Sequence, residues 1–177
     1  MPSLRLTLGL STSLAAATGA VLALSPTASA APAVPALFQD AGLAIQQNNG
    51  FIAGTGTAAA VKSAADSLNR LGVGNTALYT GAGRTGRGIV ILTGNDQPEG
   101  TDFQVLNLTA AHVQNDSRDQ DAVYADSGSF FDLDATVAPG ASVDITPVDV
   151  DFALYPPGTT PPPDNRGLNP NAQFSWS

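Results

Sequence analysis

The chain has 177 residues, with 15 acidic and 7 basic side chains, a formal net charge of −8 at pH 7, and no cysteine. This length suits one ordinary domain, and a hydrophobic fraction of 43% argues against general disorder. The lack of cysteine excludes disulfides, thiolate metal sites and cysteine nucleophiles, and a single histidine, His112, excludes a metal centre built from several histidines. Because the acidic balance repels phosphates and anionic lipids, we expect no nucleic-acid partner.

Residues 1–30 have the pattern of a signal peptide. A short positive start, Met1 to Arg5, precedes the apolar stretch Leu6 to Leu24, and a helix breaker then leads to the small residues Ala28 and Ala30. The alternative is a membrane anchor, which the small polar residues within the stretch disfavour. We expect cleavage after Ala30 and a secreted, extracellular or cell-surface protein. No later apolar run approaches the ~18 residues of a membrane span.

Two helices are expected before the strands begin. Residues 31–54 are predicted to be an N-terminal extension with a short helix from Pro35 to Asn48. A second helix is predicted from Thr57, because one stripe of it is apolar and Gly72 is placed to end it. The stripe consists of Val61, Ala64, Ala65, Leu68 and Leu71.

The rest of the sequence favours β structure. Strands are predicted at 76–80, 89–93, 103–113, 122–125, 131–137, 143–145 and 148–154. The apolar positions change from odd to even numbers at Pro147, which predicts a bulge or edge position there. The expected fold is mainly β, an antiparallel β-sandwich (immunoglobulin-like or jelly-roll-like) preceded by one or two short helices. Its helix and sandwich occupy 55–155, and a proline-rich segment, 156–177, follows with a final strand at 173–177.

Residues 81–86 match the pattern G-x-G-x-x-G. A nucleotide-binding loop needs a helix after this pattern, whereas a strand-like run, Ile89 to Thr93, follows here. The sequence therefore predicts a hairpin connection over 81–88 that carries Arg84 and Arg87.

Candidate chemistry rests on the aspartates. Asp116, Asp119 and Asp121 offer closely spaced oxygen ligands and form a weak calcium candidate, although the glycine and glutamate of an EF-hand loop are missing. The alternative is a solvated acidic loop. A second set of aspartates is expected on the exposed face of two strands: Asp132, Asp134, Asp144, Asp149 and Asp151. No Gly-x-Ser-x-Gly elbow accompanies His112, so no catalytic residue is predicted.

The leading interpretation is an exported, non-enzymatic extracellular or cell-surface β-domain with a binding or structural role. One alternative is a secreted hydrolase that uses paired aspartates. Another is a self-assembling surface-fibre subunit, in which 31–38 or 173–177 pairs with a neighbour's sheet edge. Apart from calcium no cofactor is expected, and the partner is an unidentified extracellular or cell-envelope molecule. Asn107 and Asn115 lie in glycosylation sequons, which matter only in a eukaryotic secretory pathway.

Overall fold

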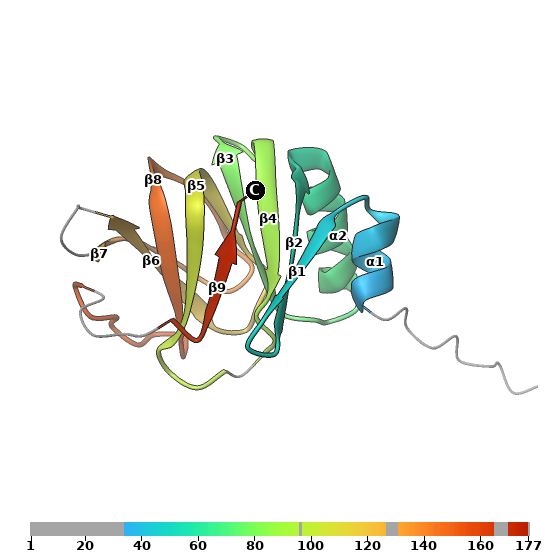
Figure 1. Cartoon of the computed structure of the whole chain (residues 1–177). Helices are drawn as coiled ribbons and strands as arrows, with labels where there is room; N and C mark the ends of the chain where they lie inside the picture. The colour runs from blue at the N-terminus through green and yellow to red at the C-terminus, as the bar shows by residue number, and fades with distance from the viewer. Residues whose placement is uncertain (1–33, 96, 127–130, 165–169, 177) are drawn as a thin grey trace, which may run out of the picture. The chain divides into compact units, whose positions relative to one another are not determined.

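The computed structural model describes residues 34–95, 97–126, 131–164 and 170–176, so the predicted signal peptide lies outside the described residues. Two helices and nine strands are described there, all within one compact unit (Figure 1). In chain order they are α1 (Val34–Asp40), β1 (Ala44–Asn48), β2 (Phe51–Thr57), α2 (Ala58–Arg70), β3 (Asn75–Gly81), β4 (Thr85–Leu92), β5 (Thr101–Asn115), β6 (Gln120–Asp126), β7 (Phe131–Val137), β8 (Ser142–Tyr155) and β9 (Ala172–Ser175).

These strands are hydrogen-bonded into one sheet in the order β1-β2-β4-β3-β5-β8-β6-β7, with β9 attached to β5. All pairs are antiparallel except β5 with β9, which is parallel. A mainly β, antiparallel fold with two helices is therefore confirmed. The sheet is curled. Strands β5 and β8 lie between β3 and β6 in the sheet, yet the hydroxyl of Thr76 on β3 donates to the carboxylate of Asp121 on β6 at 2.9 Å.

The main core lies on the inner face of this curled sheet. Phe103 and Phe152 are directly paired across β5 and β8, and their rings stack with centroids 5.0 Å apart. Phe51 of β2 meets Phe103 edge-on at 4.8 Å, so strands at both ends of the sequence contribute to one aromatic cluster. Leu78, Ile89 and other aliphatic side chains complete this cluster, whose buried members are fully or almost fully shielded from solvent.

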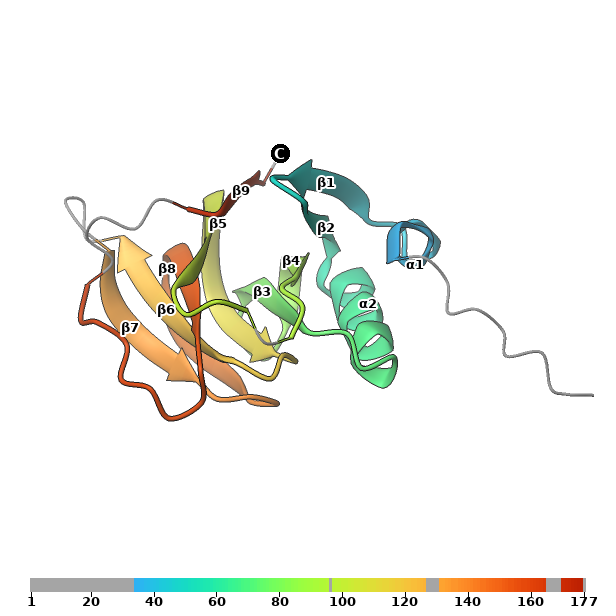
Figure 2. The same ribbon diagram turned by 90° about the horizontal axis from the view of Figure 1, so that it is seen from below.

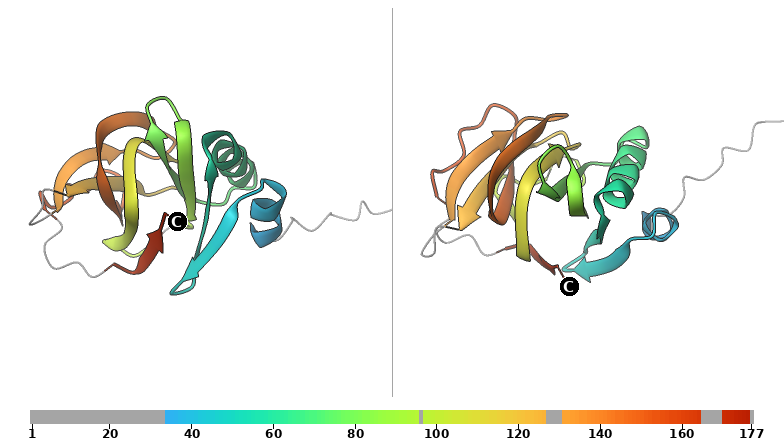
Figure 3. Two further views of the ribbon diagram at one scale, coloured as in Figure 1. Left: turned by 45° about the horizontal axis from the view of Figure 1, so that its top comes forward. Right: turned by 90° about the horizontal axis from the view of Figure 1, so that it is seen from above.

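Helix α2 forms as the sequence predicts. The Thr57 hydroxyl accepts a hydrogen bond from the backbone N–H of Ala60, and Gly72 follows the helix with a φ of 70°, which suits glycine. The apolar stripe packs against β2, β3 and β4 on the face opposite the main core, and Figure 3 shows the helices beside these strands. Leu71, the last member of the stripe, is 44% exposed.

The predicted helix over 35–48 is wrong in its second half. Helix α1 ends at Asp40, and Gly42, with a φ of 74°, reverses the chain into β1. Asn49 and Gly50 both have positive φ and join β1 to β2 as a tight hairpin. The hairpin continues the main sheet through β2 and β4, so residues 44–57 belong to the sheet.

The predicted irregularity at Pro147 is confirmed. In the pairing of β5 with β8, the register shifts between Asp144 and Val148, and residues beyond the shift carry the core face on even numbers, as Val150 and Phe152 do. The expectation that Asp151 stands on an exposed face is wrong, since Asp151 is only 4% exposed. Asp132, Asp134, Asp144 and Asp149 are exposed, as expected.

The proline-rich segment covers part of the outer face of β6 and β8, the face on which Asp151 lies beside Tyr124. The hydroxyl of Tyr124 donates to the carbonyl of Pro162, and the amide of Gln120 donates to the carbonyl of Thr159. The backbone N–H of Leu133 on β7 likewise donates to the carbonyl of Pro163. Under this cover lies a small cluster that includes Tyr124 and Tyr155.

Candidate functional site

A row of side chains crosses three neighbouring strands on the face that carries the helices. Tyr79 of β3 is paired with His112 of β5, and His112 is paired with Asp144 of β8. In the next row, Gln114 of β5 is paired with Ser142 of β8. Because side chains alternate along a strand, all of these residues lie on one face, opposite Val113 and Val143, which pack toward the main core.

His112 stands between a carboxylate and a hydroxyl. Its Nδ1 lies 2.5 Å from Oδ1 of Asp144, and its Nε2 lies 2.6 Å from Oγ of Ser142. A carboxylate can only accept, so the neutral imidazole carries its proton on Nδ1 and leaves Nε2 to accept from the Ser142 hydroxyl. This is the order of contacts in a serine, histidine and aspartate triad.

The cluster is half enclosed. The His112 side chain is 7% exposed and its ring meets the ring of Tyr79 edge-on, with centroids 5.8 Å apart. The Asp144 side chain is 59% exposed, and Ser142 is also exposed. The imidazole is therefore largely enclosed, while the two residues that it contacts on β8 are exposed.

The β3–β4 hairpin supplies a further contact to Asp144. The backbone N–H of Gly83 donates to Oδ1 of Asp144 at 2.8 Å, and this bond, followed by the contact with His112, lowers the pKa of the Asp144 carboxyl. The turn is the one that the glycine pattern predicts, and Gly83 and Arg84 both have positive φ there. Thr85 already begins β4, so the connection is shorter than expected.

Gln114 links the cluster to helix α2. Its Oε1 accepts from the Tyr79 hydroxyl at 3.1 Å and from Arg84 at 3.5 Å, and its amide donates to Asp116 at 2.6 Å. Asn69 of α2 donates to the other carboxylate oxygen of Asp116. Burial raises the pKa of the Tyr79 hydroxyl and, partly offset by the Gln114 bond, that of the Asp116 carboxyl. The hydrogen bonds thus connect the hairpin, the sheet and the helix.

The three residues of the calcium candidate are bonded to different parts of the protein. Asp116 accepts from Gln114 and Asn69, Asp119 accepts from the backbone N–H of Gln97, and Asp121 accepts from Thr76. Asp121 is fully buried, and this burial raises the pKa of its carboxyl well above the usual range. Among the described residues, no three His, Cys, Asp or Glu side chains are grouped so that they could hold a metal ion.

The two sequons lie in different surroundings. Asn107 is exposed on β5. Asn115 is fully buried, and its side-chain amide donates to the carbonyls of Asp119 and Val137. Its amide nitrogen is therefore engaged inside the folded protein.

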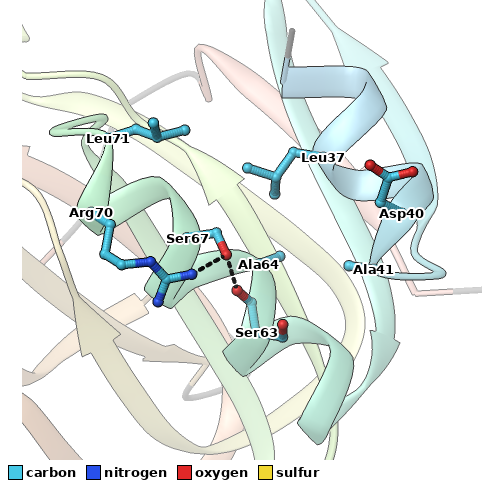
Figure 4. A pocket seen from close by; sticks show the side chains of 8 residues that line it. All are labelled: Leu37, Asp40, Ala41, Ser63, Ala64, Ser67, Arg70 and Leu71. Carbon is cyan, nitrogen blue, oxygen red and sulfur yellow. Dashed lines mark hydrogen bonds between the residues drawn. The ribbon is translucent and has the colours of Figure 1, made fainter. Parts of the chain in front are cut away.

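A second candidate is a groove of about 370 Å³ between α1 and α2. Figure 4 shows Leu37 pointing from α1 toward α2, with Asp40 beside it on α1, and Arg70 lying along α2 with its guanidinium at Ser67. Arg70 donates to the hydroxyl of Ser67, which in turn donates to the carbonyl of Ser63. The groove combines an apolar floor with one cation and one carboxylate, and it is lined by Leu37, Asp40, Ala41, Ser63, Ala64, Ser67, Arg70 and Leu71.

The sequence did not identify the partners of His112. It drew attention to His112 and to the aspartates that follow it, whereas the contacts come from Ser142 and Asp144, 30 and 32 residues away in the chain. The available signal was the pair of long strands 103–113 and 143–154, whose pairing would place these residues together.

Comparisons with known proteins return no match. No protein-family model, curated protein or solved structure matches this chain. Among the described residues, no helix is both long and apolar enough to cross a membrane.

Proposed function

We infer that this chain is an exported domain that binds a small molecule or a short peptide segment outside the cytoplasm. The groove between α1 and α2 is the observation that carries this proposal. Its volume falls within the ~300–1,000 Å³ of ordinary ligand sites, which are largely apolar with a few polar groups that orient the ligand. The pattern of residues 1–30 supports export.

The residues around the groove favour a ligand with an apolar body and an anionic group. Leu37, Ala64 and Leu71 offer the apolar contact. Arg70 uses one amino group on Ser67, and a guanidinium has further donors for a carboxylate or sulfonate. Asp40 faces the groove from α1 and disfavours a second negative charge near that end.

The curled sheet supports the groove as a scaffold. Residues of β2, β3 and β4 pack against α2 on one face, and their other face belongs to the main core. We take the two stretches of sheet that meet at Thr76 and Asp121 to be a sandwich-like arrangement, which the contact between these side chains supports.

Binding can be tested with 8-anilinonaphthalene-1-sulfonate, which has an apolar body and one sulfonate. We expect its fluorescence to rise with the purified protein and to fall back with Ser63→Phe, which fills the groove, and with Arg70→Gln. Lys62→Gln is the matched control, since it removes a cation from the same helix at a residue that does not line the groove. Equal binding by all these variants would contradict the groove as the ligand site.

Export is tested separately by the intact mass of protein recovered from culture medium. The expected secreted form begins at Ala31. Medium protein that retains Met1 to Ala30 would contradict the signal-peptide interpretation without affecting the groove.

A further inference from the structure

The contacts of His112 lie outside the groove and suggest chemistry rather than binding. The imidazole joins Asp144 at 2.5 Å and Ser142 at 2.6 Å, both within the range of direct proton transfer along hydrogen bonds. A serine hydroxyl is a poor nucleophile unless a base accepts its proton, and Nε2 of His112 is placed to do so. When Nε2 accepts the serine proton, the imidazole becomes a cation that keeps its proton on Nδ1, and the carboxylate of Asp144 stabilises this cation and fixes its orientation.

Three further features hold this arrangement. Register pairing across β5 and β8 fixes the three side chains on rigid strands rather than on a loop. The N–H of Gly83 fixes the carboxylate of Asp144 from the hairpin side. Tyr79 contacts the imidazole from the neighbouring strand. Ser142 is an exposed residue, so a reactant can approach it from solvent.

We propose that Ser142, His112 and Asp144 form an acyl-transfer centre that hydrolyses small esters. This goes beyond the proposed binding function, does not depend on the groove, and revises the expectation that the chain is non-enzymatic. Ser142 Oγ attacks the ester carbonyl carbon while its proton passes to Nε2 of His112. The bond to the alcohol oxygen then breaks, and the alcohol leaves with the proton from Nε2.

The second half of the reaction restores the serine. Water attacks the acyl group on Ser142 and gives a proton to Nε2, and the bond to Oγ then breaks as Oγ regains that proton. The net change is one ester and one water converted into one acid and one alcohol. Asp144 acts as a positioning residue because it contacts His112 and not the reacting ester.

The surroundings limit the class of ester. The site lies on the sheet surface, and the grooves described beside α1, α2 and β1 are lined by other residues. Short acyl groups with little demand for a binding cleft therefore fit best.

The test uses a fluorophosphonate probe. Ser142 Oγ would attack the phosphorus atom of the probe, and fluoride would leave as hydrogen fluoride. We expect the purified protein to be labelled at Ser142, with peptide mass spectrometry locating the adduct. Ser142→Ala should reduce labelling by about tenfold or more, and p-nitrophenyl acetate hydrolysis should fall with it. Serine and alanine are both small and position 142 is exposed, so we expect Ser142→Ala to keep the fold. A thermal melt of the variant verifies this.

Two further variants separate this activity from adventitious reactivity. Asp144→Asn keeps an acceptor for Gly83 but removes the charge behind His112, so labelling should slow while Ser142 remains present. Thr146→Ala, another exposed hydroxyl on β8, should leave labelling unchanged. An unlabelled wild-type protein, or labelling that survives Ser142→Ala, would overturn the proposal.

Discussion

The side-chain amide of Gln46 forms two hydrogen bonds with the backbone of Ser175, like those that a neighbouring strand would form. Its amide nitrogen donates to the Ser175 carbonyl at 2.6 Å, and its carbonyl oxygen accepts from the Ser175 N–H at 3.0 Å. Figure 2 shows β1 and β9 lying next to each other, although the backbone of β9 is paired only with β5. The side chain of Gln46 thus links β1 to β9, two strands that are not paired with each other in the sheet.

Replacing Gln46 with alanine should therefore lower the free energy of unfolding by about 1–2 kcal/mol, since two hydrogen bonds are lost at a partly buried position. Hydrogen exchange at the Ser175 amide should accelerate more than exchange in β3 or β4. Gln47→Ala removes the exposed neighbouring glutamine and should stay within about 0.5 kcal/mol of wild type. Equal effects from the two variants would show that the Gln46 contact contributes nothing.

The same contact bears on the fibre alternative. Residues 173–177 were expected to form a final strand, which in the fibre alternative pairs with a neighbour's sheet. The structure has a strand there, β9, and it pairs with β5 of its own chain. Its other side meets Gln46. A strand from another copy would have to displace one of these partners, so assembly through β9 requires that strand to detach first.

Phe152→Ala should cost about 3–5 kcal/mol, because Phe152 is fully buried and stacks on Phe103 in the main core. Chemical denaturation measures the loss. Thr146→Ala, an exposed position on the same strand, should stay within about 0.5 kcal/mol. A small effect at Phe152 would mean that the core can collapse around the missing ring.

The sequence predicted an element correctly where the residues that define its start, its buried face and its end all lie within that element. Helix α2 carries its stripe, its N-cap Thr57 and its terminal Gly72 within sixteen consecutive positions, 57–72. The β1–β2 hairpin was missed although Asn49-Gly50 is a strong turn signal. Both faces of β2 are covered, by the helices and by the core, so its small residues show little alternation.

The candidate site depends on information that no single segment contains. His112 meets Ser142 and Asp144 only because the register of β5 with β8 is displaced between Asp144 and Val148. The phase change at Pro147 located this displacement but did not give its size. Asp151 lies on the outer face, opposite the core, as expected, but it is buried there. The proline-rich cover of this face comes from residues 156–164, whose path the sequence did not define.

Thr57→Ala should destabilise the protein by about 1 kcal/mol, because the first turn of α2 loses the hydroxyl that accepts from the Ala60 N–H. Thr57→Ser keeps the hydroxyl and should recover most of the loss. Urea denaturation of both variants shows whether Thr57 stabilises the protein by capping α2 or by packing at the end of β2. If serine destabilises as much as alanine, packing rather than capping is the role of Thr57.

Asp121 should make the protein less stable as the pH rises from acid toward neutrality. The carboxyl is fully buried, and burial raises its pKa well above the ~3.9 of an aspartate in an unfolded chain. Between these two values the folded state holds more protons than the unfolded state, so the free energy of unfolding falls with increasing pH by at most about 1.4 kcal/mol per pH unit. Above the raised pKa the loss is complete.

Asp121→Asn removes this titration while keeping an oxygen to accept from the Thr76 hydroxyl. We expect the variant to gain stability relative to wild type as the pH rises from about 4 toward neutrality, because the stability that the protonated carboxyl of Asp121 gives the wild type is lost over this rise. Denaturation curves at a series of pH values measure the difference, and Asp149→Asn, which replaces an exposed aspartate on β8, is the matched control. A difference between Asp121→Asn and wild type that stays constant across this range would mean that the carboxyl of Asp121 does not titrate there, and that its burial is compensated within the fold.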